Sequence, residues 1–262
     1  MELQPVHGIP ALRADEYLVI GDLHIGIESH LRSKGFHLTS RTDDMFDLIV
    51  QAADDSASRL IVLGDVKDSV PGSTKQEYRE IPSFFDRLLE RFDSVDVVRG
   101  NHDTNIEEFL PDHVRIRPAS GLKIEDIGFV HGHTWPSKDV MMSETLVMAH
   151  DHPAVMFRDG VGRQVNEPCW VRGKFRDVKT EKYDVLPKNF IIVPAFNKML
   201  GGSPVNIVGE PLLGPIMGGD LIDLENSAVY LLDGVDLGKL SGLMVSGNEH
   251  KWGRRIRVKN IE

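Results

Sequence analysis

Cysteine is almost absent from this chain: its 262 residues contain only one, Cys169. A single cysteine excludes an intramolecular disulfide and a cysteine-rich zinc site, and it is typical of a reducing compartment. Long apolar runs are missing too, since no stretch reaches the roughly 18 apolar residues of a membrane-spanning helix. The first residues, MELQPVHGIPALRADEY, lack the basic start and apolar centre of a signal peptide. We therefore expect a cytoplasmic protein with no membrane contact.

An excess of positive charge is also missing. Lys and Arg number 30 against 40 Asp and Glu, which gives a formal net charge of −10. This balance argues against bulk attraction to nucleic acid. One strongly basic stretch stands out, HKWGRRIRVK at 250–259, and a weaker one is WVRGKFRDVKTEK at 170–182. Either could contact phosphates, and a solvated strand with alternating charges is the simpler interpretation of both.

The first half of the chain alternates between strand and helix patterns. Apolar segments that run into polar turns predict strands at 16–26, 59–68 and 94–103. Between them, apolar residues recur with helical spacing at 42–57 and 79–92. Strands that alternate with helices of this length are typical of βαβ units with a largely parallel inner sheet.

After residue 103 the pattern changes to successive strands with short links. These predicted strands lie at 114–119, 121–133, 146–152, 170–175 and 189–196. Pro153 is expected to end the strand before it. The Gly- and Pro-rich region 197–226 predicts an irregular lobe, and 227–240 predicts a hairpin around Asp233-Gly234.

No internal repeat, low-complexity segment or linker divides the sequence. We therefore predict one domain over 1–262, a layered α/β sandwich. Its core with the conspicuous polar turns spans 16–155, and a C-terminal elaboration spans 156–262.

Five predicted strands share one design, because each delivers an Asp, Asn or His into the turn at its carboxyl end. The segments are VIGDLHIG, VLGDVKD, VVRGNHD, FVHGH and VMAHDHP. In open α/β sheets, ligand sites lie beyond the carboxyl ends of the strands, so these ends are expected to converge. One such end is weak evidence because turns favour Asp, Asn and Gly. All five together predict a common site.

The side chains at these ends suit a site for two metal ions. Carboxylate, amide oxygen and neutral imidazole together favour Mn²⁺, Fe, Zn²⁺ or Co²⁺. In an extended segment, residues i and i+2 point the same way, so Asp22 with His24, and His150 with His152, could each present two ligands. A carboxylate can also bridge two ions about 3.5–4 Å apart.

These segments resemble the motif set of the calcineurin-like metallophosphoesterases: D-x-H, G-D-x-x-D, G-N-H-D/E, a lone His and G-H-x-H. Here the motifs are Asp22-Leu23-His24, Gly64 to Asp68, Gly100 to Asp103, His131 and Ala149 to His152. The match covers roughly residues 16–155 and agrees in residue type, order and spacing. More narrowly, GDLHIGIES and PAFNKMLGGSPVN are similar to an archaeal branch that resembles bacterial phosphoesterases associated with DNA ligases.

One position departs from the family pattern. The last motif usually begins with Gly, and this chain has Ala149. If the backbone there required a positive φ, alanine would cost on the order of 1 kcal/mol or more. We expect a turn that is compatible with alanine, so that both histidines still reach the metals.

The resemblance implies a fold and a set of metal ligands. The fold is a four-layer α/β/β/α sandwich of two mixed sheets flanked by helices. The cofactors are two divalent ions, Mn²⁺ first, with Fe, Zn²⁺, Co²⁺ and Ni²⁺ as alternatives. The first ion would be held by Asp22, His24 and His152, the second by Asn101, His131 and His150, and Asp65 would bridge them.

The resemblance also implies a reaction. It is the hydrolysis of a phosphodiester, or alternatively a phosphomonoester, by a hydroxide that bridges the two metals. His102 would bind no metal and would either stabilise charge on the phosphate or protonate the leaving oxygen, and Asp103 would orient or charge-support His102. The expected substrate is a nucleotide or a nucleic-acid end.

Three further residues are candidates for substrate contacts. They are His133, Arg41 and Asn197. His133 could instead hold a ligand in place or be structural. Arg41 lies in the polar segment after the first motif, and Asn197 lies in the Gly-rich lobe, where a role in loop structure is the alternative.

Two other functions stay open at this level. Some proteins of this fold are protein-binding scaffolds of trafficking complexes, and fold alone does not establish function. A scaffold has no need for His102, however. The third candidate is a DNA nuclease that engages DNA through the basic segment 250–259. A homodimer is compatible with each of them.

Overall fold

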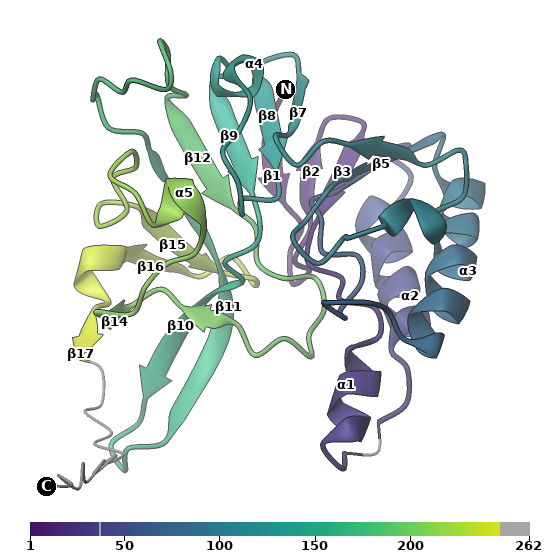
Figure 1. The fold of residues 1–262 in the computed structure, drawn as a ribbon. Helices are drawn as coiled ribbons and strands as arrows, with labels where there is room; N and C mark the ends of the chain where they lie inside the picture. Colours follow the sequence, from purple (N-terminus) through teal and green to yellow (C-terminus); the bar gives the residue numbers. More distant parts are fainter. Residues whose placement is uncertain (37, 247–262) are drawn as a thin grey trace, which may run out of the picture.

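Two mixed β-sheets pack face to face in the computed structural model, which describes residues 1–36 and 38–246 (Figure 1). The first sheet has the spatial order β1 (Leu3–Pro5), β2 (Leu12–Ala14), β3 (Tyr17–Ile20), β4 (Arg59–Val62), β5 (Ser94–Val98) and β6 (Arg115–Arg117). Strands β3 to β6 are parallel to one another, and β1 and β2 are added as an antiparallel edge.

The second sheet is larger and combines parallel with antiparallel pairs. Its order is β13 (Ser203–Pro204), β10 (Pro153–Arg158), β11 (Gln164–Lys174), β12 (Asn189–Ile192), β9 (Thr145–Met148), β8 (Ile127–Val130) and β7 (Leu122–Ile124). Strand β15 (Ala228–Leu231) pairs with β11 and with β16 (Asp236–Lys239), and β14 (Ile207–Val208) pairs separately with β17 (Val245–Ser246). Strands β8, β9 and β12 are parallel, so their carboxyl ends lie at one edge.

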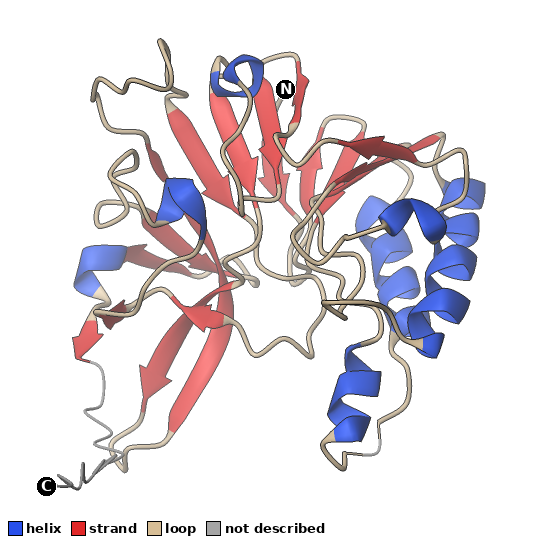
Figure 2. Cartoon of the chain, in the orientation of Figure 1, coloured by secondary structure: helices blue, strands red, loops and turns tan. Residues whose placement is uncertain are grey.

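Three apolar cores hold the layers together. Side chains such as Val19, Ile61, Phe129 and Val147 form the core between the sheets. Because successive residues of a strand point to opposite faces, the neighbours of Val19 and Ile61 pack outward against α2 (Thr42–Ala53) and α3 (Lys75–Arg91). Figure 2 shows these two long helices on one side of the molecule.

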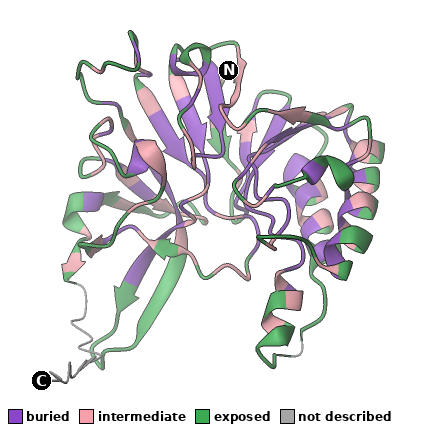
Figure 3. Cartoon of the chain, in the orientation of Figure 1, coloured by how far each residue is buried: buried purple, intermediate pink, exposed green. Residues whose placement is uncertain are grey.

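The outer face of the second sheet has a thinner cover. It consists of loops and of the short elements α4 (Lys138–Met141), α5 (Gly214–Met217) and η2 (Leu240–Gly242). The predicted four-layer α/β/β/α sandwich of two mixed sheets is confirmed. Figure 3 shows that the strands in the middle of the molecule are buried, whereas the tip of the β10–β11 hairpin is exposed.

Several predicted boundaries were wrong, for identifiable reasons. Helix α3 begins at Lys75 rather than at residue 79, because Thr74 and Glu77 form a capping box. Pro153 is the first residue of strand β10 rather than the residue that ends a strand. Its neighbours in the sheet do not need the backbone N–H that proline lacks. The predicted strand 121–133 is the hairpin of β7 and β8.

Other elements were not predicted at all. Helix α1 (Ile27–Ser33) and the 3₁₀ turn η1 (Ile106–Glu108) are too short for a periodic pattern, and β1 and β2 are edge strands of three residues. The hairpin expected at 227–240 is present as β15 and β16, with Gly234 at φ 84°.

Two findings concern the expected surroundings of the protein. Within residues 1–36 and 38–246, no helix combines the length and the apolarity needed to cross a membrane. The basic segment 250–259 lies outside the described residues, so its contact with DNA stays a prediction.

Candidate metal centre

The five polar turns converge at one edge of the sandwich. Asp22 and His24 follow β3, Asp65 follows β4, Asn101 follows β5, His131 follows β8, and His150 and His152 follow β9. Backbone hydrogen bonds continue beyond the strands and join neighbouring turns: Asp22 N–H donates to the Gly64 carbonyl at 3.1 Å and His24 N–H to Asp65 at 2.8 Å. The turns are therefore held to one another as well as to their strands.

All seven residues expected to bind metal lie together. Asp22, His24 and His152 form one group, and Asp65, His131 and His150 form a second, each with ligand atoms within 4.8 Å of one another. We call these groups the first and second clusters. The Asp65 Oδ2 atom lies 3.5 Å from His24 Nε2 and 3.3 Å from His131 Nε2, which places this carboxylate between the clusters. The Asn101 amide oxygen lies 3.0 Å from His131 Nε2.

The backbone at this site is strained. Among residues 1–36 and 38–246, nine non-glycine residues have positive φ, and they include Asp22 (58°), His24 (41°), Asp65 (49°), His150 (74°) and His152 (46°). Such conformations cost on the order of 1–3 kcal/mol each and cluster at functional sites. The expectation of extended Asp22–His24 and His150–His152 segments was wrong. In the left-handed conformation, His150 and His152 belong to different clusters.

Ala149 fits the turn without glycine. It is fully buried and has no positive φ, because that conformation falls on His150 instead. Its methyl group packs against Gly21, where an added Cβ would lie 2.9 Å from the Cβ of Ala149. Glycine is needed instead at Gly64, which has φ 75° and where a Cβ would lie 2.7 Å from Gly100 and 2.8 Å from His131 Nδ1.

Buried polar atoms without hydrogen-bond partners show that these residues fit a cation. Asp22 Oδ1, His24 Nε2 and His152 Nε2 are buried, and no described residue offers them a hydrogen bond. Such atoms are costly in a folded protein unless something satisfies them. All three belong to the first cluster, and His152 Nε2 lies 3.3 Å from Asp22 Oδ1. A divalent ion would satisfy the three atoms at once.

In two of the histidines, contacts of Nδ1 outside the clusters fix which ring nitrogen faces the clusters. His131 Nδ1–H donates to the Leu63 carbonyl at 2.7 Å, and His24 Nδ1 lies 3.2 Å from the Asp68 carboxylate. In both rings Nε2 is left for a metal, which is the usual arrangement of metal-binding histidines. The sequence interpretation gave Asp68 no role, although the spacing of G-D-x-x-D was the signal for it.

The histidines differ in charge in the metal-free protein. Burial alone lowers the pKa of His24, but the carboxylates of Asp65 and Asp68 outweigh it and raise this pKa to about 10. For His131, burial is outweighed by Asp65 and Asp22, which raise the pKa to about 9. Burial and the charge on His131 lower the pKa of His150 to about 4. Near neutral pH, His24 in the first cluster and His131 in the second are therefore protonated in the metal-free protein.

We expect metal affinity to rise with pH for this reason. Each ion must displace one proton, from His24 or His131, so the association constant should increase about tenfold per pH unit from pH 7 and level off as the pH passes about 9 to 10. Calorimetry in buffers of different ionisation enthalpy would count the released protons. Replacing the exposed His113 with Ala should leave the slope unchanged. A pH-independent affinity between pH 7 and 9 would contradict the assignment.

His102 lies beside the clusters. Its backbone N–H donates to Asp65 Oδ1 at 2.8 Å, its Nδ1–H donates to the Asp68 carbonyl at 2.6 Å, and its ring centroid lies 4.7 Å from that of His24. The half-buried ring therefore has its Nε2 available for a substrate.

Asp103 occupies a different place from the expected one. Its buried carboxylate accepts the backbone N–H groups of Val66 at 2.8 Å and Gly100 at 2.7 Å and makes no hydrogen bond to the His102 ring. Burial raises the pKa of Asp103, and the like charge of Asp65 adds to this effect. The carboxylate joins the turn that carries Asp65 to the turn that carries Asn101, and the partner of His102 Nδ1 is the Asp68 carbonyl instead.

The three candidates for substrate contacts lie in different surroundings. His133 borders the second cluster, with its ring centroid 5.2 Å from that of His131, and its buried Nδ1 has no hydrogen-bond partner among the described residues. Asn197 is buried and donates to the Leu23 carbonyl at 2.8 Å. Arg41 is exposed and pairs with Asp44. Arg41 and Asn197 line one pocket, which is described below.

Asp151 provides an unpredicted link to the C-terminal lobe. It lies between His150 and His152, is buried, and accepts the Leu213 backbone N–H at 2.8 Å. Burial raises its pKa to about 7. The lobe that carries α5 is thereby attached to the turn with two of the candidate metal ligands, a contact between residues 62 positions apart.

A two-sheet α/β sandwich with two carboxylate–histidine clusters at its strand ends defines a metal-binding hydrolase scaffold. The sequence model of the calcineurin-like phosphoesterases matches residues 16–186, which is more than half of the chain. The chain belongs to this family. No curated protein sequence matches it.

Comparison with solved structures gives matches at low sequence identity. The nuclease MPE of Pseudomonas putida is 16% identical, with 88% of this chain and 96% of that chain covered and a TM-score of 0.53. Yfce, a phosphoesterase from E. coli, is 15% identical over 85% and 97% of the two chains, with a TM-score of 0.37. Vps29 from Entamoeba histolytica is 15% identical over 71% and 80%, with a TM-score of 0.32. The likeness to MPE supports the fold, and the other two structures are too remote to support any conclusion.

Proposed function

We propose that this protein is a phosphodiesterase that uses two divalent metal ions. One observation carries the proposal: two clusters of buried ligand-type side chains share the Asp65 carboxylate between them. Asp22, His24 and His152 would hold the first ion. Asn101, His131 and His150 would hold the second, with Asp65 as the bridge. Oxygen and imidazole ligands without thiolate suit Mn²⁺, Fe, Zn²⁺ or Co²⁺. Mn²⁺ is the first candidate because the family resemblance implies it.

The residues around the clusters would position and protonate the substrate. Two bound divalent ions would neutralise charge on the phosphate and make water a nucleophile at neutral pH. His102 donates through Nδ1 to the Asp68 carbonyl, so the proton that it can give away is the one on Nε2. We assign this proton to the leaving oxygen. Asp103 keeps the His102 turn against the Asp65 turn by accepting the N–H groups of Val66 and Gly100.

We further propose a nucleotide or a nucleic-acid end as the substrate. The likeness in fold to the Pseudomonas putida protein, whose structure is described as that of a nuclease, supports this choice. The half-buried His102 next to the clusters also suits a phosphoester whose hydrolysis expels an alkoxide, because such a leaving group benefits from a proton donor.

Metal-dependent hydrolysis of a model diester tests the proposal. Purified protein is stripped with EDTA and then titrated with Mn²⁺, Fe²⁺, Zn²⁺, Co²⁺ or Ni²⁺, with bis-p-nitrophenyl phosphate and p-nitrophenyl phosphate as substrates. We expect no activity without metal, restored activity with at least Mn²⁺, and a higher kcat/KM for the diester. Inactivity on both esters with every metal, or full activity after stripping, would refute the proposal.

A further inference from the structure

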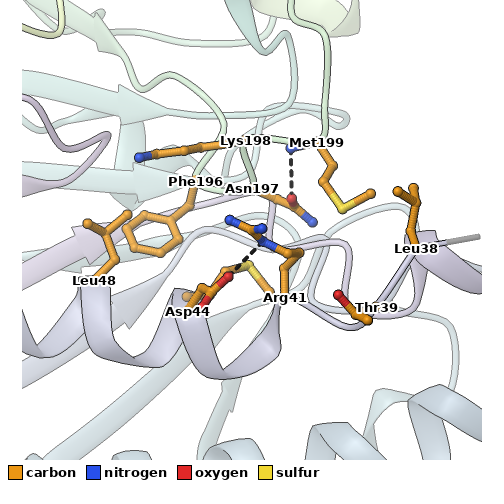
Figure 4. A pocket seen from close by; sticks show the side chains of 10 residues that line it. Leu38, Thr39, Arg41, Asp44, Leu48, Phe196, Asn197, Lys198 and Met199 are labelled. Carbon is orange, nitrogen blue, oxygen red and sulfur yellow. Dashed lines mark hydrogen bonds and ion pairs between the residues drawn. The ribbon is translucent and has the colours of Figure 1, made fainter.

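A pocket of about 370 Å³ lies next to the first cluster, between the start of α2 and the loop 196–199. Figure 4 shows Arg41 and Asp44 on the α2 side and Phe196 to Met199 on the opposite side. Its apolar lining includes Met45, Leu48, Phe196 and Met199, and of these Phe196 is fully buried. The volume lies at the small end of the range of about 300–1,000 Å³ that is usual for ligand sites.

Hydrogen bonds fasten both walls of this pocket to the segment that carries Asp22 and His24. On one side, Phe196 N–H donates to the Gly21 carbonyl at 2.9 Å, and the Asn197 side chain donates to the Leu23 carbonyl at 2.8 Å. On the other side, Arg41 N–H donates to the carboxylate of Glu28, which lies in α1 directly after this segment, at 2.8 Å. The pocket is thus fixed relative to the first cluster.

The Arg41 wall is braced further by a polar network. Gln76 of α3 donates to the buried Glu28 at 2.9 Å and accepts from Ser29 at 2.7 Å. Thr42, at the start of α2, donates to Glu80 of α3 at 2.8 Å. Because these groups satisfy one another, the pocket exists before a ligand enters, which lowers the entropic cost of binding.

Charge in the pocket favours an anionic ligand. Arg41 is compensated by Asp44, whose carboxylate lies 2.7 Å from Nε. The Lys198 ammonium is not compensated, since no ion pair joins it to a residue of the described part of the chain. Lys198 also lines a second pocket, of about 290 Å³, together with His152 of the first cluster. It therefore stands between the apolar pocket and the candidate metal site.

The lining suits a flat ring. Methionine sulfurs and a phenyl ring make favourable contacts with aromatic groups, and a guanidinium such as that of Arg41 can stack on a ring face. Thr39 and Asp44 add polar groups at the rim that can bond to ring edges. A nucleotide combines a flat ring of this kind with a phosphate, so it matches both the lining and the charge of the pocket.

We propose that this pocket binds the nucleoside of the phosphodiester substrate and that Lys198 contacts a phosphate of the same molecule; this inference rests on the proposed function. The base lies between Arg41 and Phe196 to Met199, and the scissile phosphate lies at the clusters. Arg41 and Lys198 act here as substrate-binding residues, and Asn197 acts as the brace that positions their loop.

Equilibrium binding of two phosphates tests the pocket separately from turnover. Calorimetry with Mn²⁺-loaded protein compares thymidine 5′-monophosphate with methyl phosphate, which lacks the nucleoside. We expect the nucleotide to bind at least tenfold tighter, about 1.4 kcal/mol. Arg41→Ala and Met199→Trp should each reduce this ratio about five- to tenfold, the first through lost stacking and the second through a filled pocket. Lys198→Ala should instead weaken both phosphates about equally, because both carry the phosphate that this lysine contacts. Lys188→Ala, at an exposed lysine paired with Glu144, is the control and should keep the ratio.

The outcomes separate the two proposals. If the wild type binds both phosphates equally, or if neither Arg41→Ala nor Met199→Trp changes the ratio, the pocket assignment is wrong while the diesterase function stands on its own assay. If Lys198→Ala leaves the affinity for both phosphates unchanged, the contact of Lys198 with the phosphate is wrong. If the nucleotide binds tighter and Arg41→Ala removes the preference, but no diester is hydrolysed, the pocket stands and the proposed function fails. Arg41 is exposed, so its variant tests the pocket even if Met199→Trp does not fold.

Discussion

Asp65→Asn should reduce kcat for bis-p-nitrophenyl phosphate by at least about 10³-fold, because a charge-neutralising bridge contributes several kcal/mol. The carboxylate of Asp65 lies between His24 Nε2 at 3.5 Å and His131 Nε2 at 3.3 Å, so this one side chain reaches both clusters. The amide keeps the shape but loses the negative charge. We expect bound metal, measured by elemental analysis, to fall from two ions per chain to one or none.

Asn is a better test here than Ala. Asp65 has φ 49°, a conformation that Asn tolerates and Ala does not, so Asp65→Ala would add backbone strain to the loss of the ligand. The Asn variant can also still accept the His102 N–H through its amide oxygen. Asp112→Asn, at an exposed aspartate, is the matched control. A wild-type rate, or two retained ions, would show that Asp65 does not bridge.

The charge change should also appear in the histidines. Burial opposes ionisation of Asp65, but the neighbouring imidazoles of His131 and His24 outweigh it and hold its pKa well below the usual range. The same contacts raise the pKa of His24 to about 10 and that of His131 to about 9. Without the carboxylate, both histidines should titrate closer to their ordinary value in the metal-free variant, and NMR can follow this shift.

The position of the candidate site followed from the sequence because it depends on local signals. A short apolar run that ends in Gly-Asp or Gly-Asn specifies a buried strand and the turn after it. In a parallel sheet, such turns share one edge. Asp65 after β4 and Asn101 after β5 are examples, because β4 and β5 pair in parallel register. The same alternation predicted a layered α/β sandwich, and the family resemblance implied its four layers.

The contacts within the site did not follow from the sequence, because they join residues far apart. Asp103 was expected to orient or charge-support its neighbour His102, and its carboxylate accepts the N–H of Val66, which is 37 positions away. The left-handed turns at Asp22 and His150 are equally non-local. They are held by the fold around them, because positive φ is uncommon for every residue other than glycine, although Asp and His adopt it more often than most. The pocket beside α2 likewise needs the loop 196–199, which the sequence showed only as part of a Gly-rich lobe.

His102→Ala should reduce kcat/KM on an alkyl diester by about 10²- to 10⁴-fold, the range of general acid catalysis, without changing the number of bound metal ions. The ring bonds to the Asp68 carbonyl through Nδ1 and belongs to neither cluster. The backbone N–H of residue 102 would still donate to Asp65, so the bridge should keep its position. Elemental analysis and steady-state kinetics on the same preparation would measure both quantities.

The basicity of the leaving group decides between the two roles open to His102. p-Nitrophenolate leaves without a proton, whereas an alkoxide requires one, so loss of a general acid should slow an alkyl ester far more than bis-p-nitrophenyl phosphate. With the alkyl ester, a general acid makes the rate of the wild type fall at high pH, and this fall should be absent in His102→Ala. If His102 only stabilises charge on the phosphate, His102→Ala should slow both esters to the same extent, because both carry the same phosphate charge. A wild-type rate on both esters would exclude either role.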